Sequence, residues 1–261
     1  MIIDTHCHLY YPELISQIDE IVSRAIDAGI VKMIVPAVDY ETSLTALELS
    51  EKYEMIYCAL GVHPGDVNKN EIKVIDKIEK LLTHEKVVAI GETGLDYYWD
   101  TSNIEKQKEF FQIQIELAKS NNLPVIIHTR SSVNDAVTMI ENSYDKNLSG
   151  QFHCFSGNDE ELKRILQLHN FKISFCGNIT YKNYSDSDID IIRNCPVERI
   201  LSETDSPFLP PVPFRGKKNE PAFIVNTLTK IAVIKNLDYI NLTSKLFLNA
   251  RDLFLKLKFE T

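Results

Sequence analysis

Histidine and carboxylate residues follow several apolar segments of this chain, and these residue types bind divalent metal ions. His6 and His8 come directly after the apolar start of the chain. In an extended chain residues i and i+2 point to the same side, so the two imidazoles can hold one ion between them. An isolated His-x-His pair is more often one packed and one solvated histidine, so the pair alone decides nothing.

Residues of the same kind recur after later apolar runs. Glu92 stands in AIGETGLDYY, His128 in VIIHTR, His153 in GQFHCFSG and Asp205 in ILSETDSP. A single histidine in such a place is more often structural than a ligand. Four imidazoles and two carboxylates that meet in one cavity would be costly without a compensating positive charge, which a divalent metal supplies.

The elements that must position these residues form an alternating pattern. Apolar runs of strand length are expected at residues 2–4, 32–38, 56–61, 87–91, 124–128, 151–155, 172–177 and 199–202. Helices are expected at 13–28, 41–53, 71–83, 104–121, 131–143, 158–169, 185–194, 221–236 and 239–257. Eight strands, each followed by a helix, predict one α/β domain over residues 1–261, a (β/α)8 TIM barrel with the metal site at the C-terminal rim of its strands. An open doubly wound sheet is the alternative, but no G-x-G-x-x-G follows any strand.

The size of the ligand set predicts two divalent ions. Six protein ligands exceed the three or four that a single catalytic zinc takes. Glu92 has two carboxylate oxygens and is expected to bridge ions about 3.5 to 4 Å apart. The remaining ligands divide into a first group of His6, His8 and Asp205 and a second group of His128 and His153. Mixed nitrogen and oxygen ligands suit Zn²⁺ or Mn²⁺ and, less comfortably, Mg²⁺.

Two such ions predict a hydrolase. A divalent ion lowers the pKa of bound water towards neutrality and neutralises charge that builds on a phosphoryl or carbonyl oxygen. Asp205 is the expected catalytic residue that orients the water and accepts its proton, and Glu92 contributes to catalysis by holding both ions.

The composition sets limits on location and substrate. With 28 Lys and Arg against 37 Asp and Glu, the net charge is −9, so no global positive field draws in nucleic acid. A polyanionic substrate would need local help from bound cations or from the basic segment 215–218. The start lacks the basic region of a signal peptide, and no segment is apolar enough to span a membrane. We therefore expect a cytoplasmic protein. Its five cysteines form no C-x-x-C pair, so we expect their thiols to be reduced. They are Cys7, Cys58, Cys154, Cys176 and Cys195.

Seven motifs together carry a family resemblance that covers essentially the whole chain. In order they are DTHCHL, GVHP, GETGLDYY, HTR, HCFSG, ETDSPFLPP and RGKKNEP. They resemble the TatD family of metal-dependent deoxyribonucleases, a branch of the amidohydrolase-like barrels. The resemblance implies the ligands assigned above and cleavage of DNA phosphodiesters, described for relatives as 3′ to 5′ exonuclease activity on single strands or as endonuclease activity. Action on RNA or on mis-charged tRNA is also described for relatives, so the resemblance leaves the exact substrate open. DNA with single-stranded ends is the expected partner, and no obligate protein partner is expected.

Two positions depart from the family pattern. Many relatives carry a second histidine where this chain has Gly65, and an acidic residue is frequent where it has Tyr10. His63 is kept, and the resemblance implies that it contacts the scissile phosphate. The alternative is that His63 is a turn residue packed before Pro64.

Further residues are candidates for supporting roles. Glu203 is two residues before Asp205 and shares its strand face. Its carboxylate either orients a histidine ligand or forms a salt bridge at the end of the strand. Arg215, and with less support Arg130, have the fork geometry that suits a phosphate. The aromatic residues 97–99 are suited to stacking on unpaired bases or to capping the barrel.

Two other functions stay open at this point. One is metal-dependent hydrolysis of a cyclic amide or lactone, but two-metal enzymes of that kind often use a carboxylated lysine as the bridge, and VVAIGETG offers Glu92 instead. The other is a non-catalytic binding protein on an inactive barrel. Such a protein should have lost ligands, and none is missing here, so the sequence favours a nuclease.

Overall fold

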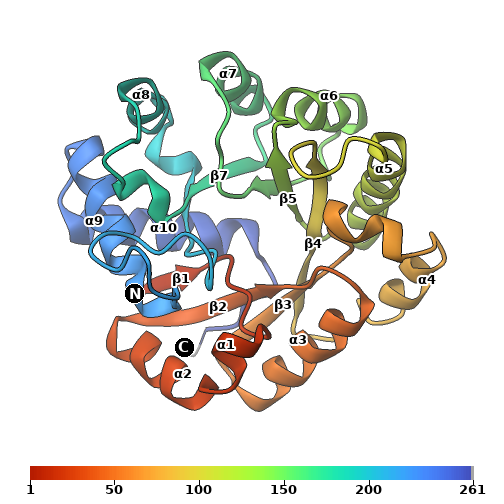
Figure 1. Cartoon of the computed structure of the whole chain (residues 1–261), viewed down its shortest axis with the longest axis horizontal. Helices are drawn as coiled ribbons and strands as arrows, with labels where there is room; N and C mark the ends of the chain where they lie inside the picture. The colour runs from red at the N-terminus through yellow and green to blue at the C-terminus, as the bar shows by residue number, and fades with distance from the viewer. Residues whose placement is uncertain (260–261) are drawn as a thin grey trace.

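The computed structural model describes residues 1–259 and has a barrel of eight parallel strands ringed by helices (Figure 1). Each strand pairs with the next one along the chain. The strands are β1 (Ile2–Asp4), β2 (Ile30–Pro36), β3 (Ile56–Leu60), β4 (Val87–Asp96), β5 (Val125–Arg130), β6 (Gly150–Phe152), β7 (Phe171–Phe175) and β8 (Ile200–Ser202). The predicted TIM barrel is therefore confirmed.

Hydrogen bonds join the first strand to the last. The backbone N–H of Thr5 donates to the carbonyl of Ser202 at 2.9 Å, and the Ser202 hydroxyl donates to the carbonyl of Ile3 at 2.7 Å. Cys7 and Ser206 form an isolated parallel bridge just beyond. These contacts bring the C-terminal ends of β1 and β8 together, which places residues after both strands on one rim.

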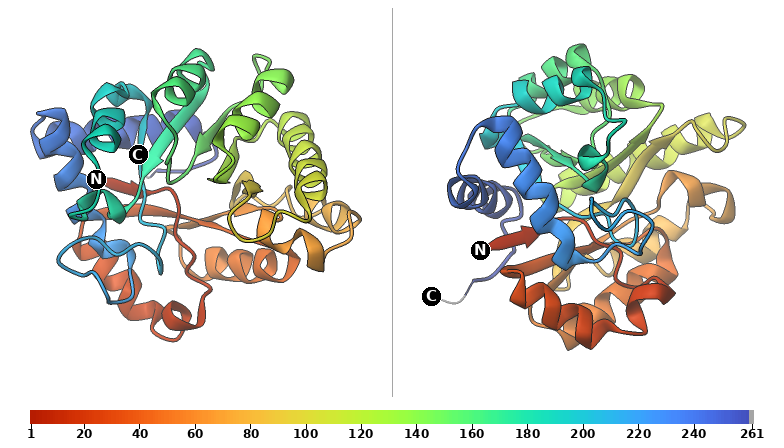
Figure 2. Two further views of the ribbon diagram at one scale, coloured as in Figure 1. Left: turned by 45° about the horizontal axis from the view of Figure 1, so that its top comes forward. Right: turned by 60° about the vertical axis from the view of Figure 1, so that its left-hand side comes forward.

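The helices lie outside the strands, and Figure 2 shows this ring from two further sides. They are α1 (Pro12–Ile15), α2 (Ile18–Asp27), α3 (Tyr40–Lys52), α4 (Val74–Glu79), α5 (Ile104–Asn121), α6 (Val133–Ser143), α7 (Asp159–Gln167), α8 (Asp186–Asn194), α9 (Ile224–Lys235) and α10 (Tyr239–Leu253). Short 3-10 helices are η1 (Pro64–Lys69), η2 (Gly177–Thr180), η3 (Val197–Arg199) and η4 (Pro221–Phe223). Within residues 1–259, every helix is too short or too polar to span a lipid bilayer.

The helices expected at 13–28 and 71–83 differ most from the structure; the helix expected at 239–257 ends at Leu253, and the one expected at 221–236 begins as η4. The helix expected at 13–28 is two helices, because the chain leaves the helical path at Gln17, where φ is −131° and ψ is 31°. Leu14 and Ile18, on either side of this break, are both buried. The helix expected at 71–83 is only α4, and the segments before and after it form turns instead.

The fourth strand is longer than expected and continues through the GETGLD motif. Gly94 has a φ of +134°, and a Cβ at this position would overlap the carbonyl oxygen of His128 on β5. Only glycine permits both this conformation and this close approach. The two strands thus stay paired as far as Asp96 and Arg130, so Glu92 lies within β4 rather than after it.

The barrel interior changes from apolar to polar along its length. Its lower part is filled by Ile3, Ile34, Ile126 and Leu201 from the strands and by Phe254 after α10. Above them Gln151 donates to Thr5, Ser174 and Glu203 at distances of 2.8 to 3.0 Å. Residues two apart on a strand share a face, so the residues that follow these inward side chains by two also point inward, nearer to the rim. They are His128 after Ile126, His153 after Gln151, Cys176 after Ser174, and Glu203 and then Asp205 after Leu201.

Candidate metal centre

Glu92 lies at the centre of a cluster that contains all six predicted metal ligands. Its Oε2 atom is 3.4 Å from Nε2 of His6 and 3.4 Å from Nε2 of His8. Its Oε1 atom is 2.9 Å from Nδ1 of His128 and 2.9 Å from Nε2 of His153. The two oxygens of one carboxylate therefore face two different histidine pairs.

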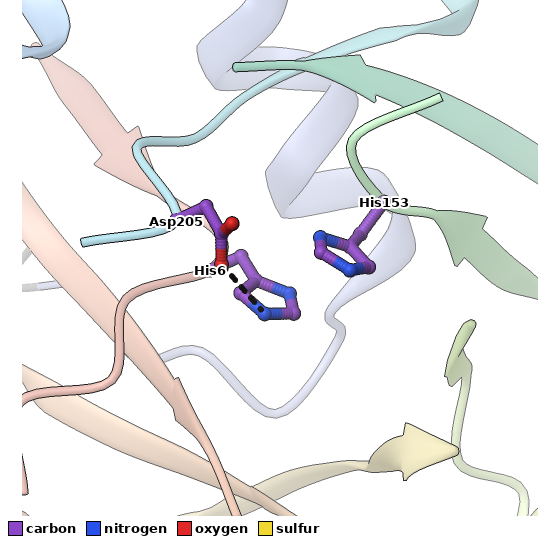
Figure 3. Close-up of side chains that lie close together, drawn as sticks. All are labelled: His6, His153 and Asp205. Carbon is purple, nitrogen blue, oxygen red and sulfur yellow. Dashed lines mark ion pairs between the residues drawn. The ribbon is translucent and has the colours of Figure 1, made fainter. Parts of the chain in front are cut away.

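Asp205 completes the first of these two groups. Its Oδ1 atom is 3.4 Å from Nε2 of His8 and 3.7 Å from Nε2 of His6. Asp205 has a left-handed backbone with φ of 57°, and its N–H donates to the carbonyl of His6 at 2.8 Å, which fixes the residue beside the end of β1. Figure 3 shows Asp205 next to His6, whose ring stacks on that of His153 with 3.9 Å between the centroids.

The cluster is buried and its charges are strongly coupled. Burial alone would raise the pKa of Glu92, but the imidazoles of His153 and His6 hold it well below its usual range. Burial would lower the pKa of His153 and His128, yet their neighbouring carboxylates raise both, that of His153 well above its ordinary value. The carboxylates thus draw positive charge into this site.

The residues fit divalent cations. The Nε2 atoms of His6 and His8 are 3.1 Å apart, close enough for both to lie about 2.0 to 2.1 Å from one ion. Two buried imidazole nitrogens at this distance repel each other unless a proton or a cation lies between them. On the other side, Nδ1 of His128 and Nε2 of His153 are 3.3 Å apart and both face Glu92. Imidazole nitrogen with carboxylate oxygen is the donor set that Zn²⁺ and Mn²⁺ accept.

Glu203 lies directly behind the cluster and is fully buried. Its Oε2 atom is 3.7 Å from Nδ1 of His153 and accepts a 3.0 Å hydrogen bond from Gln151. Its Oε1 atom accepts from the N–H of Cys154 at 2.7 Å and from the thiol of Cys176 at 3.0 Å. Burial would raise the pKa of Glu203, but its contacts with His153 lower it. Glu203 is thereby held ionised beside His153 and is placed to orient that ring.

Asp96 is a carboxylate near the cluster that the sequence reasoning missed. Its Oδ2 atom is 3.1 Å from Nε2 of His128, on the nitrogen that does not face Glu92. The signal was present, because Asp96 lies four residues after Glu92 in an extended strand and therefore shares its face.

Tyr10 and Asp4 hold the His6–His8 segment and were likewise not assigned. The Tyr10 hydroxyl is 2.9 Å from Nδ1 of His8, whose other neighbour is the carbonyl of Pro36 at 3.1 Å. Tyr10 therefore supplies a polar partner at the position where relatives often have an acid. Asp4 accepts hydrogen bonds from the N–H groups of His6 and Thr204. Burial raises the pKa of Asp4 to about 8.

A cavity of about 680 Å³ opens over the cluster. The lining includes His8, Glu92, His128, His153 and Asp205 from the cluster, together with Tyr11, His63, Trp99, Arg130 and Phe208. The Nδ1 atom of His63 accepts a 3.0 Å hydrogen bond from the N–H of Gly65, and its Nε2 atom lies 3.7 Å from Glu92. His63 thus belongs to the turn before Pro64, and its ring also faces the cluster; its predicted contact with a phosphate stays a prediction.

The two candidate arginines lie in different places. The Arg130 guanidinium lies over the ring of Tyr98, 3.8 Å from its centroid, and lines the cavity. The Arg215 guanidinium lies over the ring of Tyr181, 4.6 Å from its centroid, and is not among the residues that line the cavity. Trp99 is 74% exposed. Arg130 and Trp99 therefore form part of the cavity wall, and Arg215 stands outside it.

Comparison with known proteins identifies relatives along nearly the full chain. The family model described as "TatD related DNase" matches residues 3–255. The "Uncharacterized metal-dependent hydrolase YabD" of Bacillus subtilis (strain 168) is 39% identical over 254 residues, which cover 97% of this chain and 99% of that protein.

Solved structures agree with this match. The crystal structure of YjjV, a TatD homologue from Escherichia coli K12, superposes with a TM-score of 0.92 at 32% identity and covers 97% of this chain and 98% of that one. A TatD family hydrolase from Entamoeba histolytica has a TM-score of 0.86 at 24% identity, with 98% of each chain covered, and supports the fold alone. The chain therefore belongs to the TatD-related DNase family of metal-dependent hydrolases.

Proposed function

We propose that this chain cleaves DNA phosphodiester bonds with two divalent ions and acts as a 3′ to 5′ exonuclease on single-stranded ends. The observation that carries the proposal is the position of Glu92. Its two oxygens lie within 3.4 Å of two separate histidine pairs, as a carboxylate shared between two ions requires. His6, His8 and Asp205 would hold one ion, and His128 and His153 the other.

The ions, when bound, would acidify water and neutralise charge on a phosphoryl oxygen. Asp205 is the residue that accepts the proton of the attacking water. It lines the cavity, so its carboxylate reaches the space that a phosphodiester would occupy. The backbone bond from Asp205 to His6 keeps the carboxylate in place during proton transfer.

His63 is suited to donate a hydrogen bond to the phosphate. Its Nδ1 atom accepts from Gly65, so the ring proton resides on Nε2, which points into the site. Burial and the neighbouring His128 lower the pKa of His63 to about 3. The ring is therefore neutral at neutral pH and acts as a donor without adding charge.

Arg130 supplies a cation for a substrate phosphate. Among the described residues it forms no ion pair with a carboxylate, and the ring of Tyr98 holds its guanidinium in place. A guanidinium fork binds two phosphate oxygens at once. Arg215, outside the cavity, is placed to contact a more distant phosphate of a longer strand.

The aromatic residues at the cavity favour unpaired bases. Trp99 lies on the wall with Arg130, while Tyr11 and Phe208 pack together beside His8, with 5.3 Å between their ring centroids. Phe208 is 44% exposed and presents part of its ring to the cavity. Stacking on aromatic rings requires bases that are free of a duplex, and an acidic chain releases few counterions from duplex DNA. A single-stranded end satisfies both conditions.

The test is hydrolysis of end-labelled oligonucleotides by metal-loaded protein at fixed salt. Matched single-stranded, overhang and blunt duplex substrates are compared with and without EDTA. We expect stepwise shortening from the 3′ end of single strands, a lower kcat/KM on blunt duplex, and loss of all cleavage with EDTA. The proposal is overturned if the metal-loaded protein cleaves no DNA but hydrolyses a cyclic amide or lactone. It is also overturned if kcat/KM is equal on single-stranded and blunt duplex substrates.

A further inference from the structure

Two cysteines lie beside the metal cluster, at the ends of the neighbouring strands β6 and β7. Cys154 directly follows His153 and lines the same cavity as Asp205. Cys176 is buried behind it and donates its thiol proton to Glu203 at 3.0 Å. The two Sγ atoms and a carboxylate oxygen of Asp205 all lie within 4.8 Å of one another. None of the hydrolytic roles assigned above uses either thiol.

The spacing fits a single thiophilic cation. Metal–sulfur bonds of about 2.3 Å and metal–oxygen bonds of about 2.1 Å place two ligand atoms no more than roughly 4.6 Å apart. A small rotation of the thiol side chains brings the three atoms into this range. Asn178, the second residue after Cys176, also lines the cavity, and its side-chain oxygen is buried without a hydrogen-bond partner in the described part of the chain. At this end of the site the Asn178 oxygen is thus a polar atom that the described part of the chain leaves without a partner.

The charge around the two thiols favours a cation over oxidation. Reactive, oxidation-sensitive cysteines lie in electropositive surroundings that stabilise the thiolate. Here two carboxylates lie beside the thiols, and one of them also pairs with the imidazole of His153: Glu203 contacts the Cys176 thiol and the Cys154 backbone, and Asp205 is the third member of the group. Two carboxylates repel an isolated thiolate but attract a positive ion that thiolates can bind.

We propose that Cys154, Cys176 and Asp205 form a further site for a thiophilic cation such as Zn²⁺ or Cd²⁺, next to the histidine-held ions and sharing Asp205 with them. On binding, each thiol forms a metal–sulfur bond and releases its proton to solvent. The site takes ions that prefer sulfur, whereas Mg²⁺ and Mn²⁺ prefer the oxygen and nitrogen ligands of the main cluster. Because Asp205 belongs to both groups, a soft cation here withdraws it from hydrolysis. That consequence rests on the proposed function, but the site itself does not.

The test is a titration of the full-length, Mn²⁺-loaded protein with Cd²⁺, read as the ultraviolet charge-transfer absorption of a cadmium–thiolate bond. The thiols are first counted under denaturing conditions, where a fully reduced chain gives five. Cys154→Ser and Cys176→Ser remove one ligand each. Cys58→Ala is the matched control, because Cys58 is also buried but lies on β3 with its thiol directed to the carbonyl of Lys86. Circular dichroism confirms that each variant is folded.

We expect the absorption in the wild type and in Cys58→Ala, with a midpoint at least about tenfold higher in Cys154→Ser and Cys176→Ser, as loss of a ligand implies. Asp205→Asn should keep the absorption with a similarly weakened midpoint. The site is overturned if fully reduced wild type shows no absorption or if the cysteine variants titrate like the control. It is also overturned if the wild type gives three thiols and Cys154→Ser gives four, because these two cysteines are then joined as a disulfide. If Cys176→Ser fails to fold, the Cd²⁺ midpoint of Cys154→Ser alone tests the site, because the Cys154 side chain lines the cavity.

Discussion

Asp96 and His128 lie on adjacent strands, with Oδ2 of Asp96 3.1 Å from Nε2 of His128. This contact leaves Nδ1 of the same ring directed at Glu92, 2.9 Å away. Gly94 permits the close pairing of β4 and β5 that brings the two side chains together. Asp96 therefore determines which nitrogen of His128 is offered to a metal ion.

Asp96→Asn should weaken the ion held by His128 and His153 by about ten- to a hundredfold, because outer carboxylates orient ligating histidines and raise their basicity. The ion at His6 and His8 should be unaffected. Metal titration with analysis of bound Mn²⁺ measures both. Asp100→Asn is the control, because Asp100 is a half-buried carboxylate just after β4 that bonds to Ser102 and Asn68 and not to a histidine. Unchanged affinity for both ions would show that Asp96 does not support the site.

Asp205→Asn should keep the fold and reduce kcat by more than about a hundredfold, because an amide cannot accept the proton of the attacking water. Steady-state cleavage of a single-stranded oligonucleotide at saturating Mn²⁺ gives the number. Asp252→Asn, at the exposed end of α10, controls for loss of one acidic charge. A variant within about tenfold of wild type would exclude Asp205 as the general base.

Arg130→Ala should raise KM for oligonucleotides by about tenfold or more with little change in kcat. A phosphate contact that only positions the substrate stabilises the bound substrate and the transition state equally.

Arg215→Ala should raise KM in the same way on long oligonucleotides and leave KM for a dinucleotide unchanged, since Arg215 lies over Tyr181 and outside the cavity. Kinetics on the two substrate lengths separate these effects. A KM for long oligonucleotides that is unchanged in Arg215→Ala would remove this residue from the substrate path.

Arg199→Ala should destabilise the fold by about 2 kcal/mol, because charged hydrogen bonds contribute roughly 1.5 to 3 kcal/mol each and water replaces part of the loss. The guanidinium donates to carbonyls at the end of α7 and the start of β7, at 2.6 to 3.1 Å: Ile165, Leu166, Leu168 and Phe171. Urea unfolding followed by circular dichroism measures the change. Arg251→Ala, an exposed arginine on α10, should shift the unfolding midpoint little, and an equal shift in both variants would contradict the role of Arg199.

Much of this arrangement could be predicted from the sequence because it depends on local periodicity. The apolar runs locate the strands, and in a barrel all strand ends meet at one rim, so the sequence alone predicts that His6, His128 and His153 lie together. Glu92 was also found this way, although it lies within β4 and not after it.

The contacts that fix individual rings could not be read in the same way. The bond between Tyr10 and His8 and the separate places of Arg130 and Arg215 depend on side-chain directions and loop paths that sequence spacing does not determine. The pairing of Cys154 with Cys176 likewise needs the register of β6 beside β7.

The pair of ions bridged by Glu92 is tested by an anomalous-difference map from crystals of Mn²⁺-loaded wild type and of Mn²⁺-loaded Glu92→Gln. We expect two peaks about 3.5 to 4 Å apart in the wild type, one beside His6 and His8 and one beside His128. In Glu92→Gln one peak should lose occupancy before the other, because a neutral amide screens the two cations poorly. A single peak in the wild type, or two full peaks of unchanged affinity in Glu92→Gln, would contradict a pair of ions bridged by Glu92.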